Sequence, residues 1–462
     1  MRSPSYQGPA SRLRPMPSNI PSGAGTDGPT SGQPAAPIGD APFRRPTDED
    51  IIDLTAFHDG GGTDLFEKVD RFLAKFDAVN QRGLYLWKHR LATGCDRTSE
   101  VLTETTSPRE MILLSSNNYL GLTTHPRVIA AHCEAAMRFG TGSGSAPFAS
   151  GTSVLHRQLE HALADHKHAE DCMLFSSGYA ANLGVISALA RTSDTIFIDR
   201  LAHASIIDGA RASGARVRFF QHNDVADLDR RLARQEAGGA TLVVVDAVYS
   251  MDGDIARLPE LLGVIRRHGA VLLVDEAHAT GVLGQHGSGI AEHFGEDRNF
   301  LVTGTMSKAL ASIGGFFAGP RKVVEYVRHY ARSAMFSTAL PPSAAATALA
   351  ALQVMDEEPE RIARLGRRSR QLRDELIATG LPVGPTESPI VPVIIGDQPR
   401  LLAMARGLED LGVHASCVFY PVAPRTECRL RLSVTANHTP QDLSRAVQAI
   451  VLAHGMAAPE PA

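Results

Sequence analysis

From Met111 onward, short runs rich in β-branched residues alternate with segments of helical periodicity. The expected strands cover 171–176, 195–199, 216–220, 241–246, 270–275, 299–304 and 314–319, with helices between most of them. This alternation predicts an α/β fold with a mostly parallel sheet that helices cover on both faces. Ligands of such sheets bind at the carboxyl ends of the strands.

The rest of the chain divides around this sheet. Residues 1–45 are rich in Pro, Gly, Ser and Ala and have no hydrophobic period, so we expect a disordered tail. Residues 46–110 are expected to form an N-terminal helical arm, because apolar residues share one helical face between Asp64 and Arg90. Residues 111–336 are the predicted large domain. Residues 337–455 open with a long helix and are predicted to form a smaller α+β domain.

Composition excludes several classes of partner. The chain has 46 Lys and Arg against 50 Asp and Glu, so no basic surface for nucleic acid or an anionic membrane is expected. Its 5 cysteines are scattered without a CxxC pair, which predicts neither a disulfide framework nor a metal site. No run approaches the roughly 20 apolar residues of a membrane span, and no signal-peptide core lies near residue 1. We therefore expect a cytoplasmic protein.

Chemically active side chains follow the predicted strands. Asp275 ends one strand, with His278 three residues later, and Asp246 ends another. Lys308 follows the 299–304 strand, and Gly178-Tyr179 opens a helix after the 171–176 strand. Parallel strands therefore bring a lysine, carboxylates, a histidine and a helix N-terminus to one edge of the sheet.

Pyridoxal phosphate (PLP) requires this set of groups. A lysine amine such as that of Lys308 forms an imine with the cofactor, and a carboxylate such as Asp275 keeps the pyridine nitrogen protonated. Backbone N–H groups at a helix start, here at Gly178-Tyr179 after Ser177, suit the phosphate. The hydroxyls of Thr305, Ser307 and Ser250 are candidates for further hydrogen bonds.

Each feature alone has a plainer explanation. A lysine after a strand is usually a solvated surface residue, and His203 could be a core histidine or a helix cap. The Asp-Glu-Ala-His run at 275–278 resembles a helicase box, but the chain has no GxxxxGK[ST] loop. The glycines of 140–144 do not have the GxGxxG spacing of a dinucleotide site. Only the joint occurrence of these groups at strand ends favours PLP.

The same residues lie in segments that resemble the α-oxoamine synthases, PLP enzymes of fold type I. The resemblance covers about residues 65–450. It rests on SSNNYLGLTTHP, GTGSGSAPFASGTSVLHRQLE, FSSGYAANLGVISAL, DRLAHASIIDGAR, DAVYSMDGD, VDEAHATGVLG, TGTMSKALASIGG, FSTALPP and RLRLSVTANHT, in family order.

The resemblance implies cofactor roles for these positions. Lys308 carries the cofactor as a Schiff base, Asp275 pairs with the pyridine nitrogen, and His278 lies near the ring hydroxyl. His203 stacks on the ring and completes the catalytic set. The other implied cofactor contacts are Gly178 and Tyr179 at the phosphate, Ser250, Thr305, and Thr338 from a neighbouring subunit.

Two further positions are implied to bind substrate. Arg431, seven residues before His438, receives the amino-acid carboxylate, and Asn117 lies close to it. Because Thr338 would reach the neighbouring subunit's phosphate, the resemblance implies a homodimer with shared active sites.

The implied reaction is a decarboxylating C-acyl transfer. A small L-amino acid, with serine or alanine favoured, condenses with an acyl group carried by coenzyme A or by an acyl carrier protein. An 8-amino-7-oxononanoate synthase of biotin synthesis is one alternative. A PLP aminotransferase or lyase is a second, and a non-catalytic synthase subunit is a third, against which the retained Lys308 argues.

The chain departs from the family at Ser145-Ala146-Pro147, where many members have Gly-Ser-Arg. A proline cannot supply an arginine's donors, so this departure bears on acyl recognition.

Overall fold

The structure is a computed structural model that describes residues 46–47, 51, 53, 64, 66–82, 89–102, 108–235 and 238–457. The predicted tail, 1–45, lies outside the described residues. No helix in the described part of the chain is long and apolar enough to cross a membrane.

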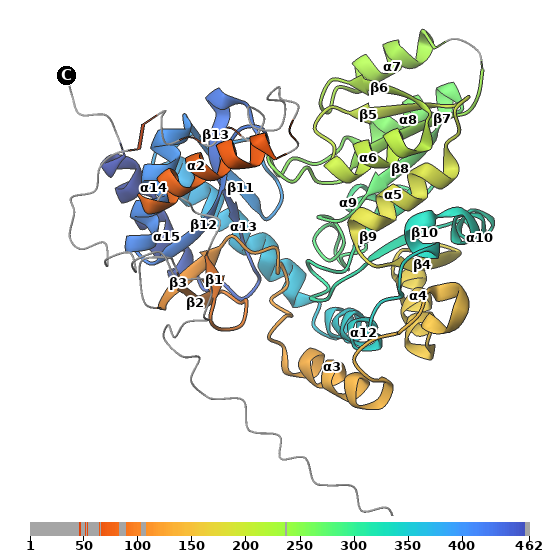
Figure 1. The fold of residues 1–462 in the computed structure, drawn as a ribbon, viewed down its shortest axis with the longest axis horizontal. Coiled ribbons are helices and arrows are strands. Elements are labelled where there is room, and N and C mark those ends of the chain that lie inside the picture. The colour runs from red at the N-terminus through yellow and green to blue at the C-terminus, as the bar shows by residue number, and fades with distance from the viewer. Residues whose placement is uncertain are drawn as a thin grey trace, which may run out of the picture. The chain divides into compact units, whose positions relative to one another are not determined.

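A seven-stranded sheet forms the centre of the larger half of the fold (Figure 1). Its strands, in spatial order, are β4 (Asp171–Phe175), β10 (Gly315–Gly319), β9 (Leu301–Thr305), β8 (Val271–Asp275), β7 (Thr241–Asp246), β5 (Thr195–Asp199) and β6 (Arg216–Phe220). Only β10 runs antiparallel to its neighbours β4 and β9. The predicted mostly parallel sheet is confirmed, and every strand expected for it is present.

Alternating side chains of these strands enter two separate cores. In β7, Leu242 and Val244 face one core, whereas Val243 and Val245 face the other. This period of two is the signature of a strand buried on both faces. The sheet therefore separates two helical layers.

Different helices cover the two faces (Figure 1). The first core is closed by α5 (Gly178–Leu189), α6 (Ala204–Ser213) and α10 (Arg321–Tyr330), with the short α11 (Arg332–Met335) packed on α5. The second is closed by α4 (Val154–His166), α7 (Val225–Ala233), α8 (Leu258–His268), α9 (Ile290–Phe294) and α12 (Pro342–Glu357). Helix α3 (Pro126–Phe139) packs on α12, and the short π-helical turn η3 (Pro147–Gly151) follows it in the chain.

A second sheet of six strands takes residues from both ends of the chain. Its order is β1 (Arg90–Leu91), β2 (Thr98–Leu102), β3 (Arg109–Leu114), β12 (Val413–Val418), β13 (Cys428–Ser433) and β11 (Ile390–Gly396). Helices α13 (Glu360–Ala378), α14 (Gln398–Asp410) and α15 (Pro440–Met456) pack with it, and the 3-10 turn η4 (Arg425–Glu427) precedes β13. Only the β3–β12 pairing is parallel.

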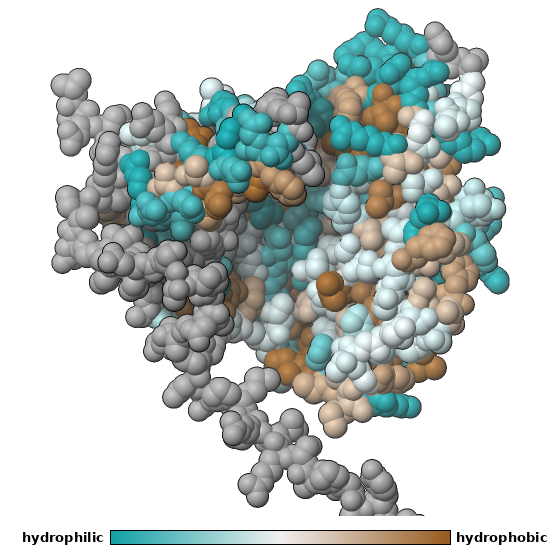
Figure 2. Space-filling model, viewed as in Figure 1, coloured by the Kyte–Doolittle hydropathy of each residue, from teal (hydrophilic) through white to brown (hydrophobic). Residues whose placement is uncertain are grey.

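The arm expected over 46–110 is only partly helical. Its helix is α2 (Glu67–Gln81), but the same segment supplies β1 and β2, which extend the second sheet. The helical pattern between Asp64 and Arg90 could not reveal these short strands, because their partners lie far along the chain. Phe66, which precedes α2, and Val69 and Leu73 within it remain about half exposed or more, and Figure 2 shows hydrophobic surface along this helix.

The boundaries predicted at 111–336 and 337–455 remain a prediction. Helix α12 belongs to the second predicted domain, yet it packs on α3 and α4 of the first. Its residues Ala345, Ala348 and Val354 join a core that extends without interruption into the second sheet. Packing therefore links the two halves.

Candidate active site

The carboxyl ends of the parallel strands carry two buried carboxylates side by side. Asp246 ends β7 and Asp275 ends β8, and the two residues are direct partners across the strand pair. Asp275 is in turn opposite Thr303 of β9. Asp246 and Asp275 are 7% and 5% exposed, so two carboxyl groups lie close together away from water. Burial first, and then the charge of Asp275, raises the pKa of Asp246 well above its ordinary value.

A chain of hydrogen bonds links the predicted cofactor lysine to the predicted substrate arginine. The amine of Lys308 lies 3.0 Å from Nε2 of His278, and Nδ1 of His278 lies 2.7 Å from the hydroxyl of Tyr119. The Tyr119 hydroxyl donates to Oδ1 of Asn117 over 3.2 Å. The same oxygen accepts from Nη1 and Nη2 of Arg431, at 3.2 and 3.3 Å.

The direction of these bonds indicates the protonation of His278. Because the Tyr119 hydroxyl donates to Asn117, it is free to accept from Nδ1–H of His278, which leaves Nε2 to accept from Lys308. Burial, and then the charge of Lys308, holds the pKa of His278 well below its ordinary value. A neutral imidazole with its proton on Nδ1 therefore satisfies every contact.

Lys308 itself is poised to lose its proton near neutral pH. Burial lowers its pKa to about 8, opposed by the negative charge of Asp275 and reinforced by the positive charge of Arg431. An amine with such a pKa is available as a nucleophile and as a base under mild conditions.

Asp275 is held in one orientation by a buried network. Its Oδ2 accepts from the amide of Asn182 at 2.6 Å, and its Oδ1 accepts from the backbone N–H of Ala277 at 2.8 Å. The Asn182 amide also donates to Ser205 at 2.9 Å and accepts from Thr303 at 2.6 Å. The carboxylate of Asp275 is thus fixed at the edge of the sheet.

His203 caps the helix that begins beside this carboxylate. It stands at the N-cap of α6, where its Nδ1 lies 2.7 Å from the hydroxyl of Ser205, and its backbone N–H donates to Asp246 at 2.9 Å. The ring is exposed and lies edge-on to Tyr179, with ring centroids 6.3 Å apart. The helix cap proposed for His203 is therefore present, and its exposed ring remains available for stacking.

The start of α5 has the features of a phosphate site. Ser177 caps the helix by accepting from the N–H of Ala180, and the first N–H groups of an α-helix have no partner within the helix. A Cβ added to Gly178 would lie 3.0 Å from Cβ of Thr305, so glycine permits close packing there. The hydroxyl of Tyr179 donates to Asp208. Thr305 bonds to Ser307 at 2.8 Å and to the carbonyl of Gly314 at 2.9 Å.

The cofactor contacts predicted for Ser250 and Thr338 remain predictions. The backbone carbonyl of Ser250 accepts a hydrogen bond from Nε of Arg431. Thr338 is exposed in the segment between α11 and α12. Among the described residues of this single chain, its hydroxyl has no hydrogen bond to the Lys308 network.

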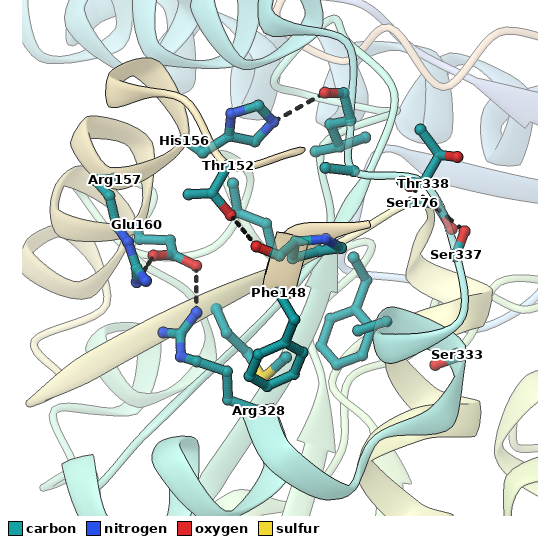
Figure 3. A pocket seen from close by; sticks show the side chains of 17 residues that line it. Phe148, Thr152, His156, Arg157, Glu160, Ser176, Arg328, Ser333, Ser337 and Thr338 are labelled. Atoms are coloured by element: carbon teal, nitrogen blue, oxygen red, sulfur yellow. Dashed lines mark hydrogen bonds and ion pairs between the residues drawn. The ribbon is translucent and has the colours of Figure 1, made fainter. Parts of the chain in front are cut away.

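Thr338 lines a pocket beside β4 (Figure 3). Phe148 of η3 and residues of β4 give the pocket apolar walls, and Ser176 and Ser337 lie near Thr338. On the other side Glu160 accepts from Arg157 at 2.6 Å and from Arg328 at 2.8 Å. The pocket lies next to the Ser145-Ala146-Pro147 departure, since Pro147 also lines it.

The sequence did not predict two residues of the site, Tyr119 and Asn182. Tyr119 lies inside the SSNNYLG segment, but only the fold brings it against His278. Asn182 follows Gly178 by four residues, a spacing that places both on one face of α5. The sequence places Asp246 at a strand end, and the strand register adds its pairing with Asp275.

The groups present fit PLP. A fixed carboxylate, a lysine amine, an exposed imidazole ring and a helix N-terminus lie around one edge of the sheet, as such a cofactor requires. These residues define a site of the PLP-dependent enzyme class.

Comparisons with known proteins agree with this class. Residues 109–450 match the family described as aminotransferase class I and II. The chain is 44% identical over 345 residues to an 8-amino-7-oxononanoate synthase of Symbiobacterium thermophilum, covering 74% of this chain and 88% of the relative. It is 39% identical over 388 residues to a serine palmitoyltransferase of Sphingobacterium spiritivorum, covering 84% and 96%.

A solved structure of serine palmitoyltransferase with PLP matches with a TM-score of 0.81 and 35% identity, covering 85% of this chain and 99% of the other. The chain therefore belongs to the aminotransferase class I and II family, and its relatives place it among the α-oxoamine synthases, as the sequence predicts. The expectation of PLP agrees with the family and with this solved structure.

Proposed function

We propose that this protein is a PLP-dependent acyltransferase that condenses a small L-amino acid with an acyl thioester and releases CO2 and the free thiol. The observation that carries the proposal is the hydrogen-bond chain from Lys308 through His278, Tyr119 and Asn117 to Arg431. It joins a base of suitable pKa to a cation suited to a carboxylate. Serine palmitoyltransferase and 8-amino-7-oxononanoate synthase are the relatives from which the substrates are inferred.

The bound cofactor supplies an electron sink for a bond that breaks at the α-carbon of the amino acid. Asp275 keeps the pyridine nitrogen charged, and Asn182 keeps the Asp275 carboxylate in place. The guanidinium of Arg431 binds the substrate carboxylate, and Lys308 removes and returns the α-proton. His278 accepts a hydrogen bond from the Lys308 amine and orients it.

The amino acid is serine or alanine, and the acyl group is carried by coenzyme A or by an acyl carrier protein. One alternative is an 8-amino-7-oxononanoate synthase, because several relatives at 41–45% identity carry that name. Pro147 stands where many members have arginine, so acyl recognition is expected to differ from theirs.

The functional unit is a homodimer with shared active sites. Exposed apolar side chains near Thr338 support this proposal, because Phe336 is 69% exposed and Phe148 is 50% exposed in the single chain. A partner subunit covering this surface would bring its own active site to Thr338. The cytoplasmic location remains a prediction.

The test scans amino acids for a change in the visible absorbance of the purified protein and then follows thiol release across acyl-CoA chain lengths. Serine or alanine should change the spectrum, and one range of acyl lengths should release thiol. If no amino acid changes the spectrum, the proposal is wrong. Consumption of a 2-oxo acid without thiol release would instead indicate an aminotransferase.

A further inference from the structure

A short hairpin follows β7 and lies between the two sheets of the fold. It spans 247–256 and is closed by an antiparallel bridge between Val248 and Ile255. The N–H of Tyr249 donates to the carbonyl of Asp254 at 3.0 Å, and Gly253 returns a bond to Tyr249 at 2.8 Å. Gly253 has φ +74°, and a Cβ there would collide with the carbonyl of Ile390. The turn is thus fixed tightly in shape.

The tip of the 247–256 hairpin holds β13. The carbonyl of Ser250 accepts from Nε of Arg431, and the carboxylate of Asp252 pairs with Nη1 of Arg429. Arg431 directs its remaining donors to Ser433 at 2.9 Å and to Asn117. Because Ser250 takes the Nε–H of the guanidinium, the position of the hairpin tip sets the plane of Arg431.

His222, which follows β6, holds the base of the same hairpin. Its Nδ1 lies 3.0 Å from Oδ1 of Asp199, and its Nε2 lies 3.1 Å from Oδ2 of Asp254. The imidazole ring also packs edge-on against Tyr249, with centroids 4.4 Å apart and planes at 88°. A histidine that donates from both nitrogens to carboxylates carries a positive charge.

His222 is the cation between the carboxylates of Asp199 and Asp254, and neutral donors bond to the same two carboxylates. The Tyr249 hydroxyl donates to Oδ2 of Asp199 at 2.9 Å, and the amide of Asn223 donates to Asp254 at 3.0 Å. Burial would lower the pKa of His222, but its bonds to Asp199 and Asp254 raise it to about 10. Burial would likewise raise the pKa of Asp199, but bonds from His222 and Asn223 keep it below its ordinary value.

We propose that His222 is a positioning residue for substrate recognition: as a cation it joins Asp199 to Asp254, fixes the 247–256 hairpin, and through the Ser250 carbonyl orients Arg431. This inference rests on the proposed function, because the ligand of Arg431 is taken to be the amino-acid carboxylate. His222 itself touches neither substrate nor cofactor.

The test compares His222→Gln with His268→Gln. His268 makes a similar contact, with Nε2 lying 2.6 Å from Asp229, but it stands at the end of α8. The dissociation constant of the amino acid is measured by titrating the visible absorbance of the purified protein. For His222→Gln we expect this constant and the amino-acid KM to rise about tenfold or more, with the acyl-CoA KM unchanged and kcat within about threefold. His268→Gln should change none of these values.

A second measurement and a second variant complete this test. Hydrogen exchange at the amides of Tyr249 and Gly253 should accelerate in His222→Gln and not in His268→Gln. If His222→Gln does not fold, Asp254→Asn tests the same link, because it keeps the size of the side chain and removes its charge. A folded His222→Gln protein with unchanged amino-acid affinity would overturn the proposal. Failure of the wild-type protein to bind any amino acid would instead overturn the proposed function.

Discussion

The amine of Lys308 lies 3.0 Å from Nε2 of His278, and Nδ1 of the same histidine contacts the hydroxyl of the buried Tyr119. The contact keeps the amine near the fixed carboxylate of Asp275 without giving it a permanent counterion. A salt bridge would hold the lysine protonated, whereas a neutral imidazole accepts a hydrogen bond and leaves the proton free to move. The pKa of about 8 for Lys308 is consistent with this arrangement.

Lys308→Ala should abolish the visible absorbance of covalently held PLP and lower turnover at least about a thousandfold. The substitution removes the amine and leaves the phosphate and carboxylate contacts intact, so free PLP should still bind. Lys322→Ala, at an exposed position on α10, is the control and should behave as wild type. An active Lys308→Ala enzyme would refute the assignment.

Tyr119→Phe should leave Nδ1 of His278 without its partner in a fully buried place. We expect a loss of about 1–3 kcal/mol in the free energy of unfolding and a fall in kcat of about tenfold or more. Denaturant unfolding and steady-state kinetics measure the two effects. Tyr326→Phe removes an exposed hydroxyl from α10 and should change neither. Wild-type kinetics in Tyr119→Phe would show that His278 needs no support from the tyrosine.

Arg431→Lys should weaken amino-acid binding about tenfold to a hundredfold while PLP remains bound. A lysine keeps the charge but lacks the planar fork that engages Ser250, Ser433 and Asn117 together. Absorbance titration with the amino acid gives the affinity, and the visible spectrum without substrate reports cofactor occupancy. Equal affinity in the two proteins would mean that Arg431 does not bind the carboxylate.

The raised pKa of His222 predicts a dependence of stability on pH. Its folded pKa of about 10 exceeds the ordinary value of 6.5, so the stabilisation is complete below pH 6.5 and is lost as pH rises through 10. Between these limits the free energy of unfolding should fall by up to about 1.4 kcal/mol per pH unit more in wild type than in His222→Gln. Urea unfolding at pH 7, 8 and 9 measures the difference. Parallel pH profiles for the two proteins would contradict this assignment.

Lys167→Met should leave the buried carboxylate of Glu276 without its counterion. Lys167 and Glu276 are both fully buried, with Nζ donating to Glu276 at 2.5 Å, to Thr280 at 2.7 Å and to the carbonyl of Ser288 at 2.8 Å. We expect a loss of about 3–5 kcal/mol in the free energy of unfolding. Arg127→Met breaks the exposed pair with Glu357 and should leave the free energy of unfolding close to that of wild type. Similar losses in both variants would contradict the role of burial.

Local pattern was enough to predict the large sheet. Most of its strands are short apolar runs bounded by turn residues, and burial on both faces requires that composition whatever the neighbours are. The exception is β6 (Arg216–Phe220), most of whose residues are exposed. The strands β1 and β2 were not predicted, because they are short and partly exposed. They form only because β1 pairs with β2 and β2 pairs with β3. Such pairing is a property of the whole chain.

The candidate site also has a part that the sequence predicts and a part that only the tertiary structure decides. Lys308, Asp275, His278 and the start of α5 follow strands directly, so the sequence by itself determined that they meet at one sheet edge and that they suit PLP. The tertiary structure decided which atoms face one another: Tyr119 against His278, the Ser250 carbonyl against Arg431, and His222 between Asp199 and Asp254. These contacts join segments from different elements of the fold. Their geometry depends on the packing of helices and sheets, which no local pattern of residues encodes.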